Sequence, residues 1–230
     1  MTKTSGELTI NGRTLSRGDI LDLVQDGRAV SLVDCDLTDA DLSSQELAGW
    51  QFKDCRMAGA SFRGSNLEDA AFIGCRGAGA NFHGAILSEA RLENCDFNNA
   101  AFVEAKANGV NFSGCKLTGA NFSRIRALGM TFIETLLVSA QLAGMSFRKS
   151  RIVKVDFASA DLAKCDFRDC IFEACSLRDA HLVDTRFEGA DLRGADLGGL
   201  RLHDAAKFKG ATISRSQASG LLAEMGLKVQ

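Results

Sequence analysis

Several residue types are scarce or missing in this chain of 230 residues. It contains no proline, no tyrosine, one tryptophan and three histidines. Proline removes a donor from a β-ladder, so its absence favours a fold in which nearly every backbone N–H joins a ladder. No apolar run approaches the ~20 residues of a membrane span, and the N-terminus lacks the apolar segment of a secretion signal. We therefore expect one soluble, cytoplasmic domain that does not associate with a membrane.

What the chain has instead is a period of five. From Leu32 to Leu202 a large apolar residue, here named site i, recurs at every fifth position without insertion. Of the thirty-five sites, sixteen are Leu, fourteen are Phe, one is Met57 and one is Ile152, and only Gly77, Ala107 and Ala127 are small. This period fits neither an amphipathic helix nor a plain strand. A short period sustained over most of a chain indicates a solenoid.

Each five-residue unit predicts one short extended side and one corner. Position i−2 is nearly always small and i−1 is usually polar, so i−2, i−1 and i alternate in, out, in as a strand does. Fourteen of the thirty-five i+2 positions are Gly. Glycine suits a corner that needs a permissive backbone.

The cysteines indicate how many sides make one coil. All eight occupy i−2 positions, namely Cys35, Cys55, Cys75, Cys95, Cys115, Cys165, Cys170 and Cys175. Six of them fall in one column if the coil repeats every twenty residues, which predicts four sides. We expect these thiols to pack as small apolar groups. In-register Cβ vectors do not converge as a disulfide requires.

Both ends of the chain carry sequences that would cap an open coil. Residues 8–15 predict a small hairpin around Asn11-Gly12, followed by a helix that begins at Ser16 and ends at Gly27. Near the C-terminus, Ser214 to Gln217 form a capping box that opens a second helix. We therefore divide the chain into a hairpin and helix cap (1–30), a β-helix of about nine coils (31–205) and a C-terminal capping or dimerisation helix (206–230).

The repeat resembles the pentapeptide repeat family, whose consensus is A(D/N)LXX. Matching units include Ala40-Asp41-Leu42, Ala120-Asn121-Phe122, Cys165-Asp166-Phe167 and Ala190-Asp191-Leu192. The resemblance covers about three quarters of the chain. It implies an all-β solenoid, specifically a right-handed quadrilateral β-helix.

No arrangement of residues predicts catalysis. His83, His181 and His203 all occupy outward positions, and none has a Cys or carboxylate partner at metal-ligand spacing. His181 and His203 lie on the same face one coil apart and are candidates for neighbours. The glycines follow the period of five and form no phosphate-binding loop. We expect a protein that is not an enzyme and holds no cofactor or metal.

The C-terminal helix resembles that of the Qnr-type topoisomerase-protection proteins. The resemblance rests on Gln217-Ala218-Ser219-Gly220-Leu221-Leu222 and on Gly226-Leu227. It implies a homodimer joined end to end through Leu221, Leu222, Met225 and Leu227. It also implies binding to DNA gyrase or topoisomerase IV as a mimic of duplex DNA, with protection from quinolones and thus antibiotic resistance. A plain hydrophobic end cap is the alternative interpretation of this helix.

The charge pattern only partly fits a DNA mimic. Outward positions from Ser31 to Asp204 carry 24 acids and 19 bases, whereas duplex DNA carries an unopposed charge every ~1.7 Å. The charge is zoned, with a net −7 over 31–104, +7 over 105–155 and −5 over 156–196. A C-terminal dimer would bring its two −5 zones together. We therefore predict a partner-binding surface that includes Asp156, Asp179 and Asp196.

Two other functions remain open from the sequence. The chain fits a structural or adaptor protein with a different protein partner. Direct nucleic-acid binding through the basic zone is the weaker alternative, because acidic zones flank it and the surface lacks aromatic residues for stacking on bases.

Overall fold

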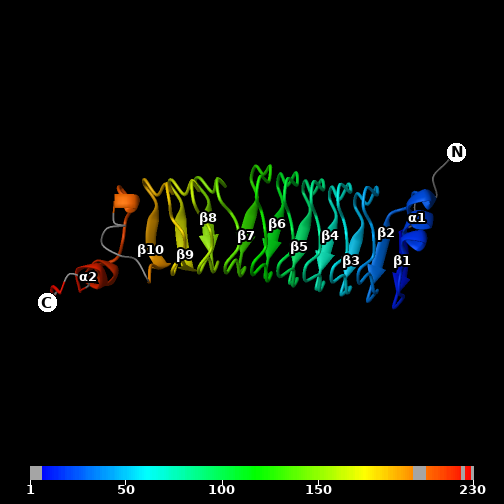
Figure 1. Ribbon diagram of the computed structural model, residues 1–230, viewed down its shortest axis with the longest axis horizontal. Helices are drawn as coiled ribbons and strands as arrows, with labels where there is room; N and C mark the ends of the chain where they lie inside the picture. The colour runs from blue at the N-terminus through cyan, green and yellow to red at the C-terminus, as the bar shows by residue number, and fades with distance from the viewer. Residues whose placement is uncertain (1–6, 199–205, 224–225, 229–230) are drawn as a thin grey trace. The chain divides into compact units, whose positions relative to one another are not determined.

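The structure is a computed structural model that describes residues 7–198, 206–223 and 226–228 (Figure 1). The chain divides into two compact units, Met1–Thr131 and Phe132–Gln230. Composition predicted one domain, so this division is a feature that sequence reasoning did not anticipate.

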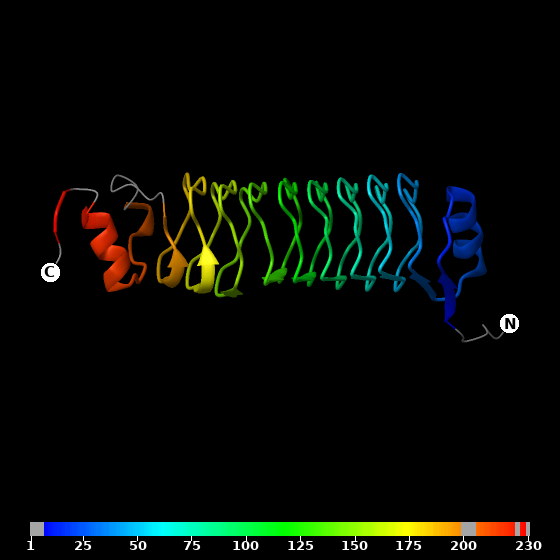
Figure 2. The same cartoon turned by 90° about the horizontal axis from the view of Figure 1, so that it is seen from below.

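Both units are parallel β-solenoids in which each coil contributes one regular strand (Figures 1 and 2). The first unit holds β1 (Leu8–Asn11), β2 (Val30–Val33), β3 (Gln51–Lys53), β4 (Ala71–Ile73), β5 (Arg91–Glu93) and β6 (Asn111–Ser113), and β7 (Thr131–Ile133) spans the division. The second unit holds β8 (Arg151–Val153), β9 (Ile171–Ser176) and β10 (Asp191–Asp196). Register partners lie twenty residues apart, as for Phe52 and Phe72. The predicted four-sided coil is therefore confirmed.

The five positions of the repeat have the predicted roles. Site i and position i−2 supply nearly the whole buried core. Every i+2 residue from Asp34 to Gly189 has a positive φ angle, whether or not it is glycine. At many corners the N–H of i+3 donates to the carbonyl of i, as from Ala40 to Leu37 at 3.0 Å, which together with the positive φ describes a type II turn.

The cysteines pack inside the coils as predicted. All eight are free and buried. Each thiol donates to a backbone carbonyl, as Cys75 does to Phe52 of the preceding coil at 3.2 Å. Burial raises the pKa of Cys165 to about 12 and that of Cys170 to about 11. A thiol with such a pKa is a poor nucleophile at neutral pH.

One exception to the large apolar site i is explained by its neighbours in the column. A Cβ atom at Gly77 would lie 2.2 Å from the ring of Phe97 and 2.9 Å from Met57. The Phe97 ring thus occupies the space that a side chain at 77 would need. Phe97, one coil further on, therefore fills the core volume that Gly77 leaves empty.

The predicted N-terminal hairpin is wrong. β1 pairs with β2 in parallel, from Leu8 opposite Val30 to Asn11 opposite Val33, and Thr14 forms a parallel bridge to Asp36. Asn11-Gly12 makes a coil corner, with φ 62° at Gly12, because pairing with the next coil satisfies the strand better than folding back on itself. Residues 8–15 therefore add two sides of a further coil.

The predicted N-terminal helix is confirmed as α1 (Arg17–Asp26). Ser16 is its N-cap and forms a capping box with Asp19, and Gly27 ends it in the left-handed conformation. Ile20 is fully buried. The guanidinium of Arg17 anchors the helix by donating to Asp41 and, at 3.3 Å, to Ser43 Oγ of the first full coil.

The C-terminal cap begins with one more side of coil. Thr212 pairs with Asp191 in parallel, and Phe208 stacks on Phe187 at 4.8 Å. These partners are 21 residues apart, so the strict period has ended by then. The helix α2 (Arg215–Ala223) follows. Two predicted features, Leu202 as the last site i and His203, lie outside the described residues.

No helix among the described residues has the length and apolar character needed to cross a membrane.

Candidate partner-binding surfaces

The structure brings the three predicted acidic residues to neighbouring positions of the second unit. Asp156 pairs in register with Ser176, and Ser176 pairs with Asp196. Asp156 and Asp196 therefore share one outward column, two coils apart. Asp179 occupies the next corner, where it is exposed and has φ 55°.

Their carboxylates have different surroundings. Asp196 accepts hydrogen bonds from Arg178 at 3.2 Å (Nε) and 2.9 Å (Nη2). Asp156 is half-buried, and its Oδ1 accepts from the backbone N–H of Ala158 at 2.9 Å. Only Asp179 is both exposed and without a cation among the described residues within 4.0 Å. The predicted surface thus contains one neutralised acid and two free ones.

Ion pairs neutralise much of the acidic zone around this surface. Of the ten acids from Asp156 to Asp196, seven lie within 4.0 Å of a cation or a histidine, namely Asp161, Asp166, Asp169, Glu173, Glu188, Asp191 and Asp196. Among the described residues no such partner is found for Asp156, Asp179 and Asp184. The net charge of −5 is therefore carried mainly by a few acids rather than by a continuous array.

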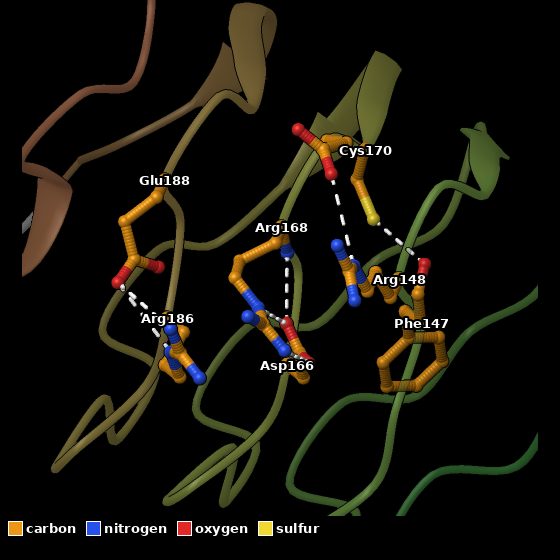
Figure 3. A network of polar contacts seen from close by, with 8 residues as sticks. Phe147, Arg148, Asp166, Arg168, Cys170, Arg186 and Glu188 are labelled. Atoms are coloured by element: carbon orange, nitrogen blue, oxygen red, sulfur yellow. Dashed lines mark hydrogen bonds and ion pairs between the residues drawn. The ribbon is translucent and has the colours of Figure 1, made fainter.

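Figure 3 shows how densely one side of this unit is paired. Arg168 makes two side-chain hydrogen bonds to Asp166, at 2.8 Å (Nε) and 2.5 Å (Nη2). One coil further on, Arg186 donates to Glu188 at 3.3 Å. The guanidinium of Arg168 holds the pKa of the Asp166 carboxyl below its usual value.

Several ion pairs in the molecule join residues that are twenty positions apart and therefore lie in one column. Arg56 contacts Asp36 at 2.9 Å, Lys154 contacts Glu134 at 2.8 Å, and His181 contacts Asp161 at 3.0 Å. Hydrogen bonds from Thr38, then from Arg56, lower the pKa of Asp36 to about 2. Assigning columns to the charged residues would have identified these pairs from the sequence alone.

The basic zone divides into paired and free cations. Arg124, Arg148, Arg151 and Lys154 contact carboxylates. No ion pair is found among the described residues for Lys106, Lys116, Arg126 and Lys149. Lys106 and Arg126 are direct neighbours in one column of the first unit. Two adjacent cations are a small footprint for the backbone of a nucleic acid.

The predicted dimer residues differ in exposure. Leu221 is half-buried, whereas Leu222 is 36% exposed and Leu227 is 52% exposed. Met225 lies outside the described residues. The side chains of Leu222 and Leu227 are thus accessible for contact with another surface.

The described residues contain no group of three or more His, Cys, Asp or Glu that could hold a metal ion. His83 lies 3.6 Å from Glu104, and His181 pairs with Asp161. A hollow of about 550 Å³ in the second unit is lined by both signs of charge, including Arg186, Glu188 and Lys209.

Comparison with known proteins agrees with this architecture. A family model described as a pentapeptide repeat region matches residues 28–102. A second, described as pentapeptide repeats (8 copies), matches residues 85–124, 135–173 and 170–206. No curated protein sequence matches the chain.

Solved structures show the same fold. A trypsin-treated form of QnrB1, described as a plasmid-mediated fluoroquinolone resistance protein, is similar with a TM-score of 0.72 and 20% identity, over 98% of this chain and 100% of that one. A second trypsin-treated form of QnrB1 gives a TM-score of 0.50 at the same identity and coverage. The repeat, the four-sided coil and the two family models lead to one conclusion. The chain belongs to the pentapeptide repeat family.

Proposed function

We propose that this protein binds DNA gyrase or topoisomerase IV without catalysing a reaction, and that it protects the enzyme from quinolones. The observation that carries the proposal is the likeness to QnrB1, a fluoroquinolone resistance protein, over 98% of this chain. That coverage includes α2 as well as the coils. Side-by-side stacking of short strands gives a stiff surface on which charges keep fixed positions.

The proposed contact surface is centred on Asp156, Asp179 and Asp196. A partner that binds DNA presents cations, and free carboxylates at fixed positions attract them. Asp179 and Asp156 supply such carboxylates directly. Asp196 contributes once a cation of the partner competes with Arg178 for it.

The first experiment is a gyrase supercoiling assay with the purified protein, with and without a fluoroquinolone. The proposal predicts that the protein restores supercoiling in the presence of the drug. A folded protein that leaves the inhibition unchanged over a wide concentration range would refute it.

Charge reversal tests the surface separately. Asp179→Lys and Asp184→Lys form a matched pair, because both acids lie at corners, with φ 55° and 57°, and neither has an ion-pair partner among the residues that the structure describes. Asp179→Lys should weaken protection at least tenfold, whereas Asp184→Lys should leave it within twofold of the parent. Equal effects would mean that Asp179 is not part of the contact.

Homodimerisation through α2 is a further part of the proposal. The exposed side chains of Leu222 and Leu227 favour it, because pairing would remove both from water. Leu222→Glu with Leu227→Glu should convert a dimer into a monomer in sedimentation equilibrium. A parent protein that is monomeric at high concentration would exclude this contact.

An adaptor role with another protein partner is the second candidate. It is favoured by the arginines that neutralise six of the ten acids in the acidic zone, since duplex DNA has no such internal cations. A protein that does not alter gyrase activity but captures one partner in a salt-resistant complex would support this role.

A further inference from the structure

The hydrogen-bond ladder ends at a single side chain. Asp191 of β10 pairs with Thr212 in parallel, and the flanking ladder bonds join Thr212 N to Ala190 O and Leu192 N to Thr212 O, both at 2.8 Å. In a parallel ladder the bonds are evenly spaced. The next bond in register would therefore join Ser214 N to Leu192 O.

The carboxamide of Gln217 takes the place of that bond. Its Oε1 accepts from Ser214 N at 2.6 Å, and its Nε2 donates to Leu192 O at 2.8 Å. The same Nε2 also donates to Ala195 O at 2.7 Å. One side chain thus satisfies the donor of the leaving strand and two carbonyls of the last strand.

We propose that Gln217 terminates the solenoid, because its carboxamide inserts into the ladder like a peptide group and directs the chain out of the coil into α2. Ser214 is released from the ladder and becomes the N-cap, where its Oγ accepts from Gln217 N at 3.2 Å. The same residue therefore ends the strand and begins the helix. It is a positioning residue for every side chain that α2 presents.

The N-terminal end has a comparable device. On α1, Arg17 donates from Nη1 to the backbone carbonyl of Asp41 at 3.3 Å. In the coils that follow, the equivalent carbonyl of Ser61 accepts from the backbone N–H of Leu42 at 2.7 Å. A helix side chain replaces the backbone donor of a missing coil at each end.

The test uses the full chain and compares hydrogen exchange of α2 with that of β9. Gln217→Glu keeps an acceptor for Ser214 N but loses the donor to Leu192 O and Ala195 O. Gln217→Met retains the length and loses both functions. Ser219→Ala is the control, because this half-buried residue lies on the same helix and, among the described residues, its hydroxyl donates within that helix, to Arg215 O at 2.9 Å.

At pH 7 both Gln217 variants should lower the protection factors of α2 at least tenfold and leave those of β9 unchanged. For Gln217→Glu, protonation restores one donor, so protection should return as the pH falls below the pKa of the new carboxyl. Gln217→Met should show no such recovery.

Three results would overturn the proposal. The Gln217 variants could match Ser219→Ala in α2, which would make the carboxamide dispensable. They could reduce protection equally in α2 and β9, which would make Gln217 a general contributor to stability. Gln217→Glu could also respond to pH no differently from Gln217→Met, which would exclude a role for the donated hydrogen bonds.

Discussion

The two units differ in how evenly their cores are stacked. In the first unit the rings of Phe62, Phe82, Phe102 and Phe122 follow one another at 4.9 Å, with interplanar angles of 3°, 1° and 7°. In the second unit the rings of Phe147, Phe167, Phe187 and Phe208 are 4.8, 5.3 and 4.8 Å apart, and the angles widen to 8°, 10° and 23°. Among site i residues the angles thus rise only to 8° and 10° in the second unit, and the widest angle, 23°, involves Phe208 of the C-terminal cap, where the period of five has ended.

The difference follows position i−2 rather than site i. From Cys55 to Ala120 every i−2 residue is Ala, Cys, Ser or Val. In the second unit Thr135, Met145 and Thr185 interrupt this series, and Met145 remains 8% exposed. A small i−2 residue allows neighbouring sides to close around the rings. A larger or more polar one changes the space that those rings must fill.

The same rule describes the segment next to the division between units. Ile125 and Met130 bring large side chains to i−2 in the first unit, and Ile125 is only half-buried. Leu128 is 81% exposed. Residues 125–134 also lie outside every match to the family models. The repeat is therefore weakest in sequence and in packing over the same residues.

The largest expected effect on stability comes from truncating one phenylalanine ring in the stack of each unit. Phe102→Ala should cost about 3–5 kcal/mol and Phe147→Ala should fall near the lower limit, because Phe102 is fully buried and Phe147 is 5% exposed. Urea unfolding followed by circular dichroism measures both. If the two variants lost equal amounts of unfolding free energy, the evenness of ring stacking would not contribute to stability.

The fluorescence of the single tryptophan, Trp50, reports on the stability of the first unit. Trp50 is 3% exposed and lies 6.2 Å from the ring of Phe52 in the first unit. Phe102→Ala should lower the midpoint of its fluorescence transition. Phe147→Ala should leave that midpoint unchanged if the units unfold separately, and should lower it if they unfold together.

The sequence predicted the fold well because each of its rules is local and repeated. The period, the small i−2 residue and the glycine corners act within one coil, so twenty residues already contain the information. The hairpin prediction at residues 8–15 failed because Asn11-Gly12 suits a coil corner as well as a tight turn. Only pairing with Val30–Val33 distinguishes the two.

The surface was predicted less well because side-chain partners depend on distance as well as on column. Asp156 and Asp196 share a column, as the period of twenty predicts, whereas the role of these two residues and Asp179 as a partner-binding surface stays a prediction. Nothing in the local pattern showed that Arg178 would contact Asp196. Gln217 was identified as part of a capping box, but its bonds to Leu192 and Ala195 required the path of the chain through residues 206–212.

A smaller effect tests how tightly the first unit is packed. Gly77→Ala places a methyl group against the Phe97 ring and should cost about 2 kcal/mol by overpacking. Gly79→Ala meets no atom within 4 Å and should cost about 1 kcal/mol, because φ is +70° there. Adding Phe97→Leu to Gly77→Ala should recover part of the loss. A double variant no more stable than the sum of its parts would contradict this packing.

The smallest expected effect compares one surface carboxylate from each unit. Hydrogen bonds lower the pKa of Asp36 to about 2, with Thr38 as the main cause, and lower that of Asp191 to about 2, with Arg193 as the main cause. A depressed pKa stabilises the folded state above the unfolded value of ~3.9, and this stabilisation is lost as the pH falls through the folded value. Asp36→Asn and Asp191→Asn should each lower Tm by about 1–3 °C at pH 7, and the difference from the parent should vanish near pH 2.

The dependence on salt concentration distinguishes the two sites, because screening weakens the ion pair of Asp191 with Arg193 more than it weakens a hydrogen bond from a neutral threonine to Asp36. At high ionic strength the effect of Asp191→Asn should therefore shrink by more than that of Asp36→Asn. Equal salt dependence would mean that charge, rather than the local turn, lowers both pKa values.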